Sequence, residues 1–434
     1  MEPPIIGLLG IVFLVILLFI GMPVGLAMAL VGFAGFATLT SIQGALGQLS
    51  TVPYFTLASY DFSILPLFLL MGAVAFHAGL SESLFRAAYK WVGGWRGGLA
   101  MAAVLGCAGF SAVSGSTLAT AVTMGKMALP EMKRHGYHPS LASGTVAAAG
   151  SLGILIPPSS IFVLYGLMTE QSIGALFIAG ILPGILLTLL FMGSIYLQTL
   201  LRSDLGPPGP KTGWIEKIIE AKRAVPVLLV FLVIIGGLYL GWFTPTEAAG
   251  AGAFIILLYG VVCRRLTLRG FSASLLESLK TTAMIFVILI GAQLFGYFIA
   301  VSRLPSELAS YLVGLQTSPY IILALIVLIY IFLGCLMDTM AMVVLTVPIF
   351  YPIILSLGFD PIWFGVLMVL VSEMGVITPP IGVNVYAVCG IAKDIDMVDV
   401  FKGTIPFFIA MIICVIIVIV FPEIATYLPS LIRY

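Results

Sequence analysis

Two short stretches of this chain place paired prolines beside glycine and hydroxyl residues inside long apolar runs. They read "GSLGILIPPSS" at 150–160 and "GVITPPIG" at 375–382. Proline has no amide hydrogen and obstructs helical hydrogen bonding, so each pair leaves backbone carbonyls unpaired. Carbonyl and hydroxyl oxygens are the ligands that hard cations prefer, and Na⁺ suits such a set. The chemistry predicted for both stretches is therefore cation binding.

Each break follows a segment rich in turn-forming and hydroxyl residues, "SGST" at 114–117 and "GCLMDT" at 334–339. Helix N-termini at these tips would attract an anionic substrate. Intramembrane acids are functional candidates by default. Asp338 either helps to hold a cation or caps a helix. Glu373 either faces a water-accessible cavity or makes an interhelical hydrogen bond. Weaker candidates for substrate contact are Ser159, Ser160 and Asn384.

The elements that must position these residues are membrane helices. The chain has 434 residues, 61% of them hydrophobic and 9% charged, with mean hydropathy +1.21. Apolar runs of about 20 residues recur along its length. The net charge of +1 gives no reason to expect a nucleic-acid partner. No GxxxxGK[ST], HExxH or GxSxG motif occurs, so we expect no enzyme. We expect helices near 5–21, 24–40, 63–80, 139–168, 173–200, 224–241, 245–263, 281–300, 363–391 and 405–428.

The positive charges predict an orientation for these helices. With both termini outside, only Arg303 and Arg433 of the 19 Lys and Arg residues fall outside. The segment 98–125 must then begin and end inside. Its 28 residues would span about 42 Å as helix, whereas two full crossings need about 60 Å. It is therefore predicted to be a re-entrant hairpin opening to the cytoplasm, and 319–357 a hairpin opening to the opposite side.

An internal repeat relates the two halves of the chain. Six Gly and Pro positions between 130 and 158 recur between 352 and 380 at a constant offset of 222. Each unit then has five transmembrane helices and one hairpin, and the odd number inverts the second unit. We predict an all-α polytopic protein with a first repeat at 1–203, a cytoplasmic linker at 204–223 and a second repeat at 224–434. Inverted repeats with broken helices at mid-membrane are typical of secondary transporters.

Several motifs resemble the large membrane (M) subunit of tripartite ATP-independent periplasmic (TRAP) transporters. They include "GMPVGLAMALVG" (21–32), "GFSAVSGSTLAT" (109–120), "LGILIPPS" (152–159), "GWFTPTEAAG" (241–250), "LGCLMDTMA" (333–341) and "GVITPPIGVN" (375–384). The resemblance covers nearly the whole chain. It implies Na⁺-coupled import of a small organic acid, commonly a C4-dicarboxylate or sialic acid, across the bacterial inner membrane. It also implies an elevator movement of a transport domain against a scaffold, with both termini periplasmic.

The resemblance further implies partners and site residues. The partners are a periplasmic substrate-binding (P) protein and a small four-helix membrane (Q) subunit, and two or more Na⁺ ions are expected. The first Na⁺ site maps to Ser114, Ser116, Gly153, Ile156 and Pro158. The second maps to Gly334, Asp338, Thr339, Gly375, Thr378 and Pro380. Substrate contacts are expected at Gly115, Thr117, Ser159, Ser160 and Asn384.

Other function classes predict different behaviour. A self-sufficient Na⁺- or H⁺-coupled organic-anion symporter would transport at full rate without partners. A passive channel would show flux without saturation and without Na⁺ dependence. A membrane scaffold has no use for two equivalent polar breaks.

Overall fold

The computed structural model describes residues 2–209, 212–314 and 317–431, and every regular element in these ranges is a helix. Lys211 and Arg433, which entered the predicted charge distribution, lie outside the described residues. Up to the first break the elements are α1 (Pro3–Phe19), α2 (Val24–Leu39), α3 (Ile42–Ala58), η1 (Tyr60–Ser63), α4 (Ile64–His77), α5 (Leu80–Val92), α6 (Gly98–Ser114), α7 (Thr117–Arg134), α8 (Pro139–Gly150) and α9 (Leu152–Leu155). Beyond it are α10 (Ser160–Thr169), α11 (Ile173–Leu201), α12 (Trp214–Tyr239), α13 (Pro245–Val262), α14 (Leu268–Ser302), α15 (Leu304–Gly314), α16 (Pro319–Gly334), α17 (Thr339–Ser356), α18 (Pro361–Gly375), α19 (Val383–Ile391), α20 (Met397–Val420) and α21 (Glu423–Ser430).

Six of the described helical stretches are long and apolar enough to cross a membrane, namely 60–77, α11, α13, α14, α17 and α20. The count rises to seven if α8–α9 and α10, bent by 40° at the first proline pair, form one span. Large apolar side chains such as Leu232, Phe254 and Leu328 point outward from the helices and are more than half exposed. Outward apolar side chains on long helices suit contact with lipid tails. The chain is a multi-pass membrane protein.

The observed elements differ from the expected ones mainly at three helices. Helices α3, α5 and α15 were not predicted, because none forms a continuous apolar run. In α5, Leu84 and Phe85 are buried whereas Glu82 and Arg86 are exposed. The predicted linker 204–223 is partly helical, since α12 begins at Trp214. The second arm of the first hairpin also runs past 125, to the end of α7.

Small residues allow helices from distant parts of the sequence to pack closely. A Cβ atom on Gly291 of α14 would lie 2.0 Å from the carbonyl oxygen of Gly25 on α2. A Cβ atom on Gly403 of α20 would lie 1.9 Å from the carbonyl oxygen of Ser140 on α8. Close backbone approach through small residues is a common way for membrane helices to associate. These contacts fix α14 and α20 against the first half of the chain.

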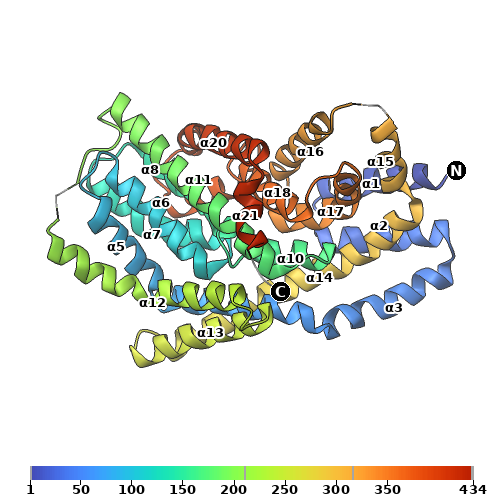
Figure 1. Ribbon diagram of the computed structural model, residues 1–434, viewed down its shortest axis with the longest axis horizontal. Coiled ribbons are helices and arrows are strands. Elements are labelled where there is room, and N and C mark those ends of the chain that lie inside the picture. Colours follow the sequence, from blue (N-terminus) through green and yellow to red (C-terminus); the bar gives the residue numbers. More distant parts are fainter. Residues whose placement is uncertain (1, 210–211, 315–316, 432–434) are drawn as a thin grey trace.

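Two helical hairpins dominate the arrangement. Helices α6 and α7 pack together and are joined by Gly115 and Ser116 alone, while α16 and α17 are joined by residues 335–338. Each arm has 16–18 residues and is about 24–27 Å long. Figure 1 shows α6, α7 and α8 towards one end of the molecule and α15, α16 and α17 towards the other. Helices α10 and α18 lie between these groups (Figure 1), so one half of each broken helix lies near the middle of the fold.

Candidate functional site

The first hairpin tip lies directly on the first helix break. Gly115 adopts a left-handed conformation, with φ of +58°, and ends α6. Ser160 Oγ, at the start of α10, donates a hydrogen bond of 2.9 Å to the Gly115 carbonyl oxygen. A Cβ atom on Gly153 would lie only 2.5 Å from the Ser116 carbonyl oxygen. The sequence prediction that "SGST" meets "GILIPP" therefore agrees with the packing of these residues.

Backbone oxygens at this break lack protein donors. Pro157 has no amide hydrogen to donate to Gly153, four residues earlier. Among the described residues, nothing donates a hydrogen bond to the carbonyl oxygens of Ile156 and Pro158. The serine hydroxyls of the tip have partners: Ser114 Oγ lies 2.8 Å from Thr120 Oγ1, and Ser116 Oγ accepts from the Ala119 amide at 3.3 Å. A hydroxyl that accepts one hydrogen bond retains a second lone pair for a cation.

The second hairpin tip and the second break form a similar contact. A Cβ atom on Gly375 would lie 2.3 Å from the carbonyl carbon of Gly334, so the end of α16 touches α18 through backbone atoms. In the ranges that the structure covers, the carbonyl oxygens of Gly334, Thr378 and Pro380 accept no hydrogen bond. The Gly375 carbonyl is already used, because it accepts from the Thr378 amide at 3.0 Å. The Pro157–Pro158 and Pro379–Pro380 peptide bonds are both cis.

Two side chains of the second predicted Na⁺ site form hydrogen bonds with backbone atoms of nearby helices. Asp338 is the N-cap of α17, and its Oδ2 accepts from the Met340 amide at 3.0 Å. Thr378 Oγ1 donates to the Met374 carbonyl oxygen at 2.6 Å. Of the two roles considered for Asp338, the geometry thus includes the cap. The backbone amides of Thr339 and Ala341 also interact with this carboxylate, so Asp338 sits at the positive end of α17.

Glu373 links the two hairpins. Its side chain, with 1% of its surface exposed, receives a hydrogen bond from Thr117 Oγ1 at 2.9 Å and another from Thr339 Oγ1 at 3.2 Å. These threonines are the first residues of α7 and α17, directly after the two tips. Of the two interpretations of Glu373, the structure supports the interhelical hydrogen bond, and it makes two of them. One carboxylate therefore fixes both tips at the centre of the fold.

Asn384 connects the second break to the helix of the first. Its Nδ2 donates to the Ala147 carbonyl oxygen on α8 at 3.0 Å, and its buried Oδ1 has no partner among the described residues. Ser159 is fully buried and caps α10 by accepting from the Phe162 amide at 3.4 Å. Both of these predicted substrate contacts are buried in the structure.

A cavity of about 360 Å³ lies between the hairpin tips and α14. A volume of this size is in the range of small-molecule sites. Its polar lining comprises predicted site residues from both halves together with residues of α14: Ser116, Thr117, Ser160, Glu277, Thr281, Asp338 and Thr339. A neighbouring cavity of about 250 Å³ shares Ser116, Glu277 and Thr281 and is also lined by Lys126.

The sequence reasoning missed Glu277, Thr281 and Lys126. Lys126 had a visible signal, a lone cation near the end of the predicted hairpin segment. Glu277 and Thr281 had none, because only the packing of α14 brings them to the hairpins.

The charges around the larger cavity are unusual for an anion site. Its described lining contains two carboxylates, Glu277 and Asp338, and no Lys or Arg. Like charges at close range repel strongly where water is excluded. Bound cations would offset the repulsion between these carboxylates and an acidic ligand, and Glu277 already has His77 Nε2 at 3.6 Å. Among the described residues no group of three or more His, Cys, Asp or Glu side chains is placed to hold a metal ion, so the oxygens at the breaks are the candidate cation ligands.

Comparison with known proteins assigns the chain to a family. The family model described as "Tripartite ATP-independent periplasmic transporter, DctM component" matches residues 11–424. The chain belongs to this family. It is 37% identical over 375 residues to the C4-dicarboxylate TRAP transporter large permease protein of Pseudomonas aeruginosa, covering 86% of each chain. It is 36% identical over 420 residues to the sialic acid TRAP transporter large permease protein of Vibrio cholerae, covering 96% of each.

A solved structure extends the comparison to the fold. The YdaH transporter of Alcanivorax borkumensis superposes with a TM-score of 0.63 at 16% identity, covering 89% of this chain and 88% of that one. The likeness at this identity concerns the fold alone. Together the matches confirm the predicted family and the expectation that the chain is a transporter permease, not an enzyme.

Proposed function

We propose that this TRAP permease imports a small organic acid together with Na⁺, after a periplasmic binding protein delivers the acid. The supporting observation is the cavity between the hairpin tips, whose described lining has carboxylates but no basic side chain. Beside it, each helix break leaves carbonyl oxygens without a hydrogen-bond donor. Unpaired carbonyls are costly at membrane depth unless a ligand binds them. Bound Na⁺ would satisfy these oxygens and offset the repulsion between the carboxylates and an acidic substrate.

The proposed Na⁺ sites follow the two contacts between tip and break. In the first, the carbonyls of Gly153, Ile156 and Pro158 and the region of Ser114 and Ser116 supply the ligands. In the second, the carbonyls of Gly334, Thr378 and Pro380, with Asp338 and Thr339, supply them. Na⁺ is a co-substrate here and moves with the acid. The relatives named for C4-dicarboxylate and sialic acid transport favour a carboxylate as the cargo.

We further propose an elevator movement within an inverted repeat. The order of elements supports it, because a hairpin followed by a broken helix and a long span occurs as α6–α11 and again as α16–α20. The moving part would comprise both hairpins and both broken helices, which Glu373 and Asn384 tie together. The proposed partners are a small four-helix membrane subunit, which widens the scaffold, and the periplasmic binding protein. Both termini would then lie on the periplasmic side of the inner membrane.

Uptake into proteoliposomes tests this proposal. The chain and its small subunit would be reconstituted, and labelled C4-dicarboxylate or sialic acid supplied with the binding protein under an inward Na⁺ gradient. We expect saturable uptake that requires both Na⁺ and the binding protein and that stops when K⁺ replaces Na⁺. Full-rate uptake by the chain alone would instead identify a self-sufficient symporter. Unsaturable flux without Na⁺ dependence would identify a channel.

A further inference from the structure

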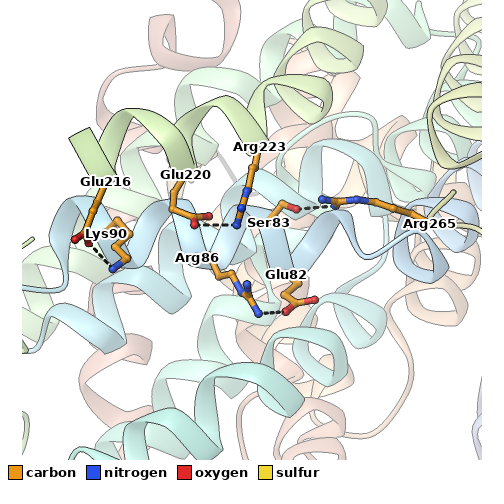
Figure 2. A network of polar contacts seen from close by, with 8 residues as sticks. All are labelled: Glu82, Ser83, Arg86, Lys90, Glu216, Glu220, Arg223 and Arg265. Atoms are coloured by element: carbon orange, nitrogen blue, oxygen red, sulfur yellow. Dashed lines mark hydrogen bonds and ion pairs between the residues drawn. The ribbon is translucent and has the colours of Figure 1, made fainter. Parts of the chain in front are cut away.

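A separate cavity, of about 270 Å³, lies near the start of α5, and its lining is basic. Its charged side chains are Arg86 of α5, Arg223 of α12, Arg265 of the α13–α14 turn and a single carboxylate, Glu82; His77 and Ser83 also line it. Figure 2 shows the three arginines reaching the start of α5 from three different elements. None of the side chains that line the cavity between the hairpin tips takes part in this lining. The two cavities therefore differ both in residues and in charge.

The arginines retain N–H donors that none of the described residues uses. Arg265 Nη1 donates to Ser83 Oγ at 3.0 Å, and no ion pair of the described residues includes Arg265. Arg223 Nη1 donates to Glu220 Oε1 at 2.9 Å. A guanidinium has five N–H groups in a planar fork, which matches phosphate oxygens. Most of this donor capacity is therefore available to a bound anion.

The backbone adds further donors. Gly79 is the N-cap of α5 and has φ of +68°. As a glycine it has no side chain that could accept hydrogen bonds from the first amides of the helix. The first amides of a helix have no intrahelical acceptors, and they lie at the positive end of the helix dipole. Gly79 lines the same cavity as the arginines. Guanidinium groups and a helix N-terminus converging on one cavity are the features of a phosphate site.

The position of this cavity indicates what carries the phosphate. His77 is the last residue of one candidate span, and Arg265 lies in the turn between two others, α13 and α14. The cavity therefore lies where membrane helices end. Beside that turn, Val262 is 70% and Leu268 89% exposed, which suits contact with acyl chains. We propose that this cavity binds the phosphate headgroup of an anionic phospholipid, independently of ion-coupled uptake.

The charge balance supports an anionic lipid over a zwitterionic one. The network in Figure 2 contains four cationic side chains (Lys90 and three arginines) and three carboxylates (Glu82, Glu216 and Glu220). A headgroup with one net negative charge would bring this network to neutrality, whereas the ammonium of a zwitterionic headgroup cancels the charge of its own phosphate. Basic pockets between membrane helices are known sites for anionic headgroups. The bound lipid would brace α5, and with it the first hairpin, against α12.

Native mass spectrometry of the intact purified chain tests the proposal. The protein in detergent would be titrated with phosphatidylglycerol and, separately, with phosphatidylcholine. We expect preferential retention of phosphatidylglycerol, weakened about fivefold by each of Arg223→Gln and Arg265→Gln. Arg269→Gln is the matched control, because Arg269 is exposed on the first turn of α14 and does not line the cavity. It should retain phosphatidylglycerol as the wild type does.

A gain-of-binding variant makes the test independent of folding defects. Glu82→Gln removes the carboxylate that occupies Arg86, so phosphatidylglycerol retention should rise. Thermal unfolding of each variant checks that the fold is kept. Equal retention of both lipids, or no response to any of the three cavity substitutions, would overturn the proposal. Displacement of phosphatidylglycerol by millimolar inorganic phosphate would also overturn it, by indicating a site for free anions.

Discussion

Replacing Gly375 by alanine tests the contact that forms the second proposed Na⁺ site. The added Cβ would lie 2.3 Å from the Gly334 carbonyl carbon, where ordinary contact begins at 3.4 Å. The hairpin tip and α18 must therefore separate by about 1 Å, because the three nearest atoms all belong to the backbone of Gly334. A binding site needs its ligands within about 0.5 Å of their productive positions. Overpacking of this kind costs about 1–3 kcal/mol. If ion binding must restore the contact, the Na⁺ concentration for half-maximal uptake should rise roughly 5- to 150-fold.

The assay is Na⁺ titration of uptake in proteoliposomes, with thermal unfolding measured in parallel. Gly390→Ala is the matched control, because Gly390 lies in α19 and an added Cβ there meets no atom within 4 Å. The control should titrate as the wild type does. If Gly375→Ala and Gly390→Ala both gave wild-type Na⁺ titrations, the second site would not depend on the contact between α16 and α18. The assignment of its oxygens would then be wrong.

Three further predictions concern ion ligands, the link between hairpins and pH. Ser116→Ala should raise the Na⁺ half-saturation about fivefold, the effect of about 1 kcal/mol of lost interaction, and a wild-type titration would contradict the place of the Ser116 hydroxyl in the first site. Thr378→Ala keeps the carbonyl oxygen assigned to the second site and removes only the hydroxyl that holds the Met374 carbonyl, so its effect should be smaller. Glu373→Ala should weaken Na⁺ dependence at both sites together. Glu373→Gln keeps an acceptor oxygen and should weaken it less. An equal loss in both variants would count against a positioning role for Glu373. The hydrogen bond and positive charge of Lys133 lower the pKa of Asp394. The pair therefore stabilises the folded state fully above the ordinary carboxyl pKa of about 3.9. This stabilisation is lost as the pH falls through the lowered pKa. Asp394→Asn should therefore flatten the acid dependence of amide hydrogen exchange at the end of α7, and an unchanged profile would show that the pair has no such effect.

Local chemistry explains which elements could be predicted. The proline pairs are incompatible with continuous helix, so both breaks were visible in the sequence, and α10 and α19 do begin just after them. The tip "SGST" has the glycine that a left-handed turn favours, and Gly115 adopts that conformation. Helices α3, α5 and α15 were missed because none contains a continuous apolar run, and in α5 the apolar residues form one face. Only the tertiary structure shows which neighbouring helix buries such a face.

The sequence by itself determined that this is a multi-pass membrane protein of the TRAP family with two interrupted helices, because hydropathy and proline stereochemistry are properties of short segments. Only the tertiary structure decided that Thr117, Thr339 and Glu373 meet, since more than 200 residues separate the two threonines. It also decided that Glu277 and Thr281 of α14 line the cavity at the tips, and that Arg86, Arg223 and Arg265 share another. These groups come together through the packing of distant helices, which no local pattern of residues encodes.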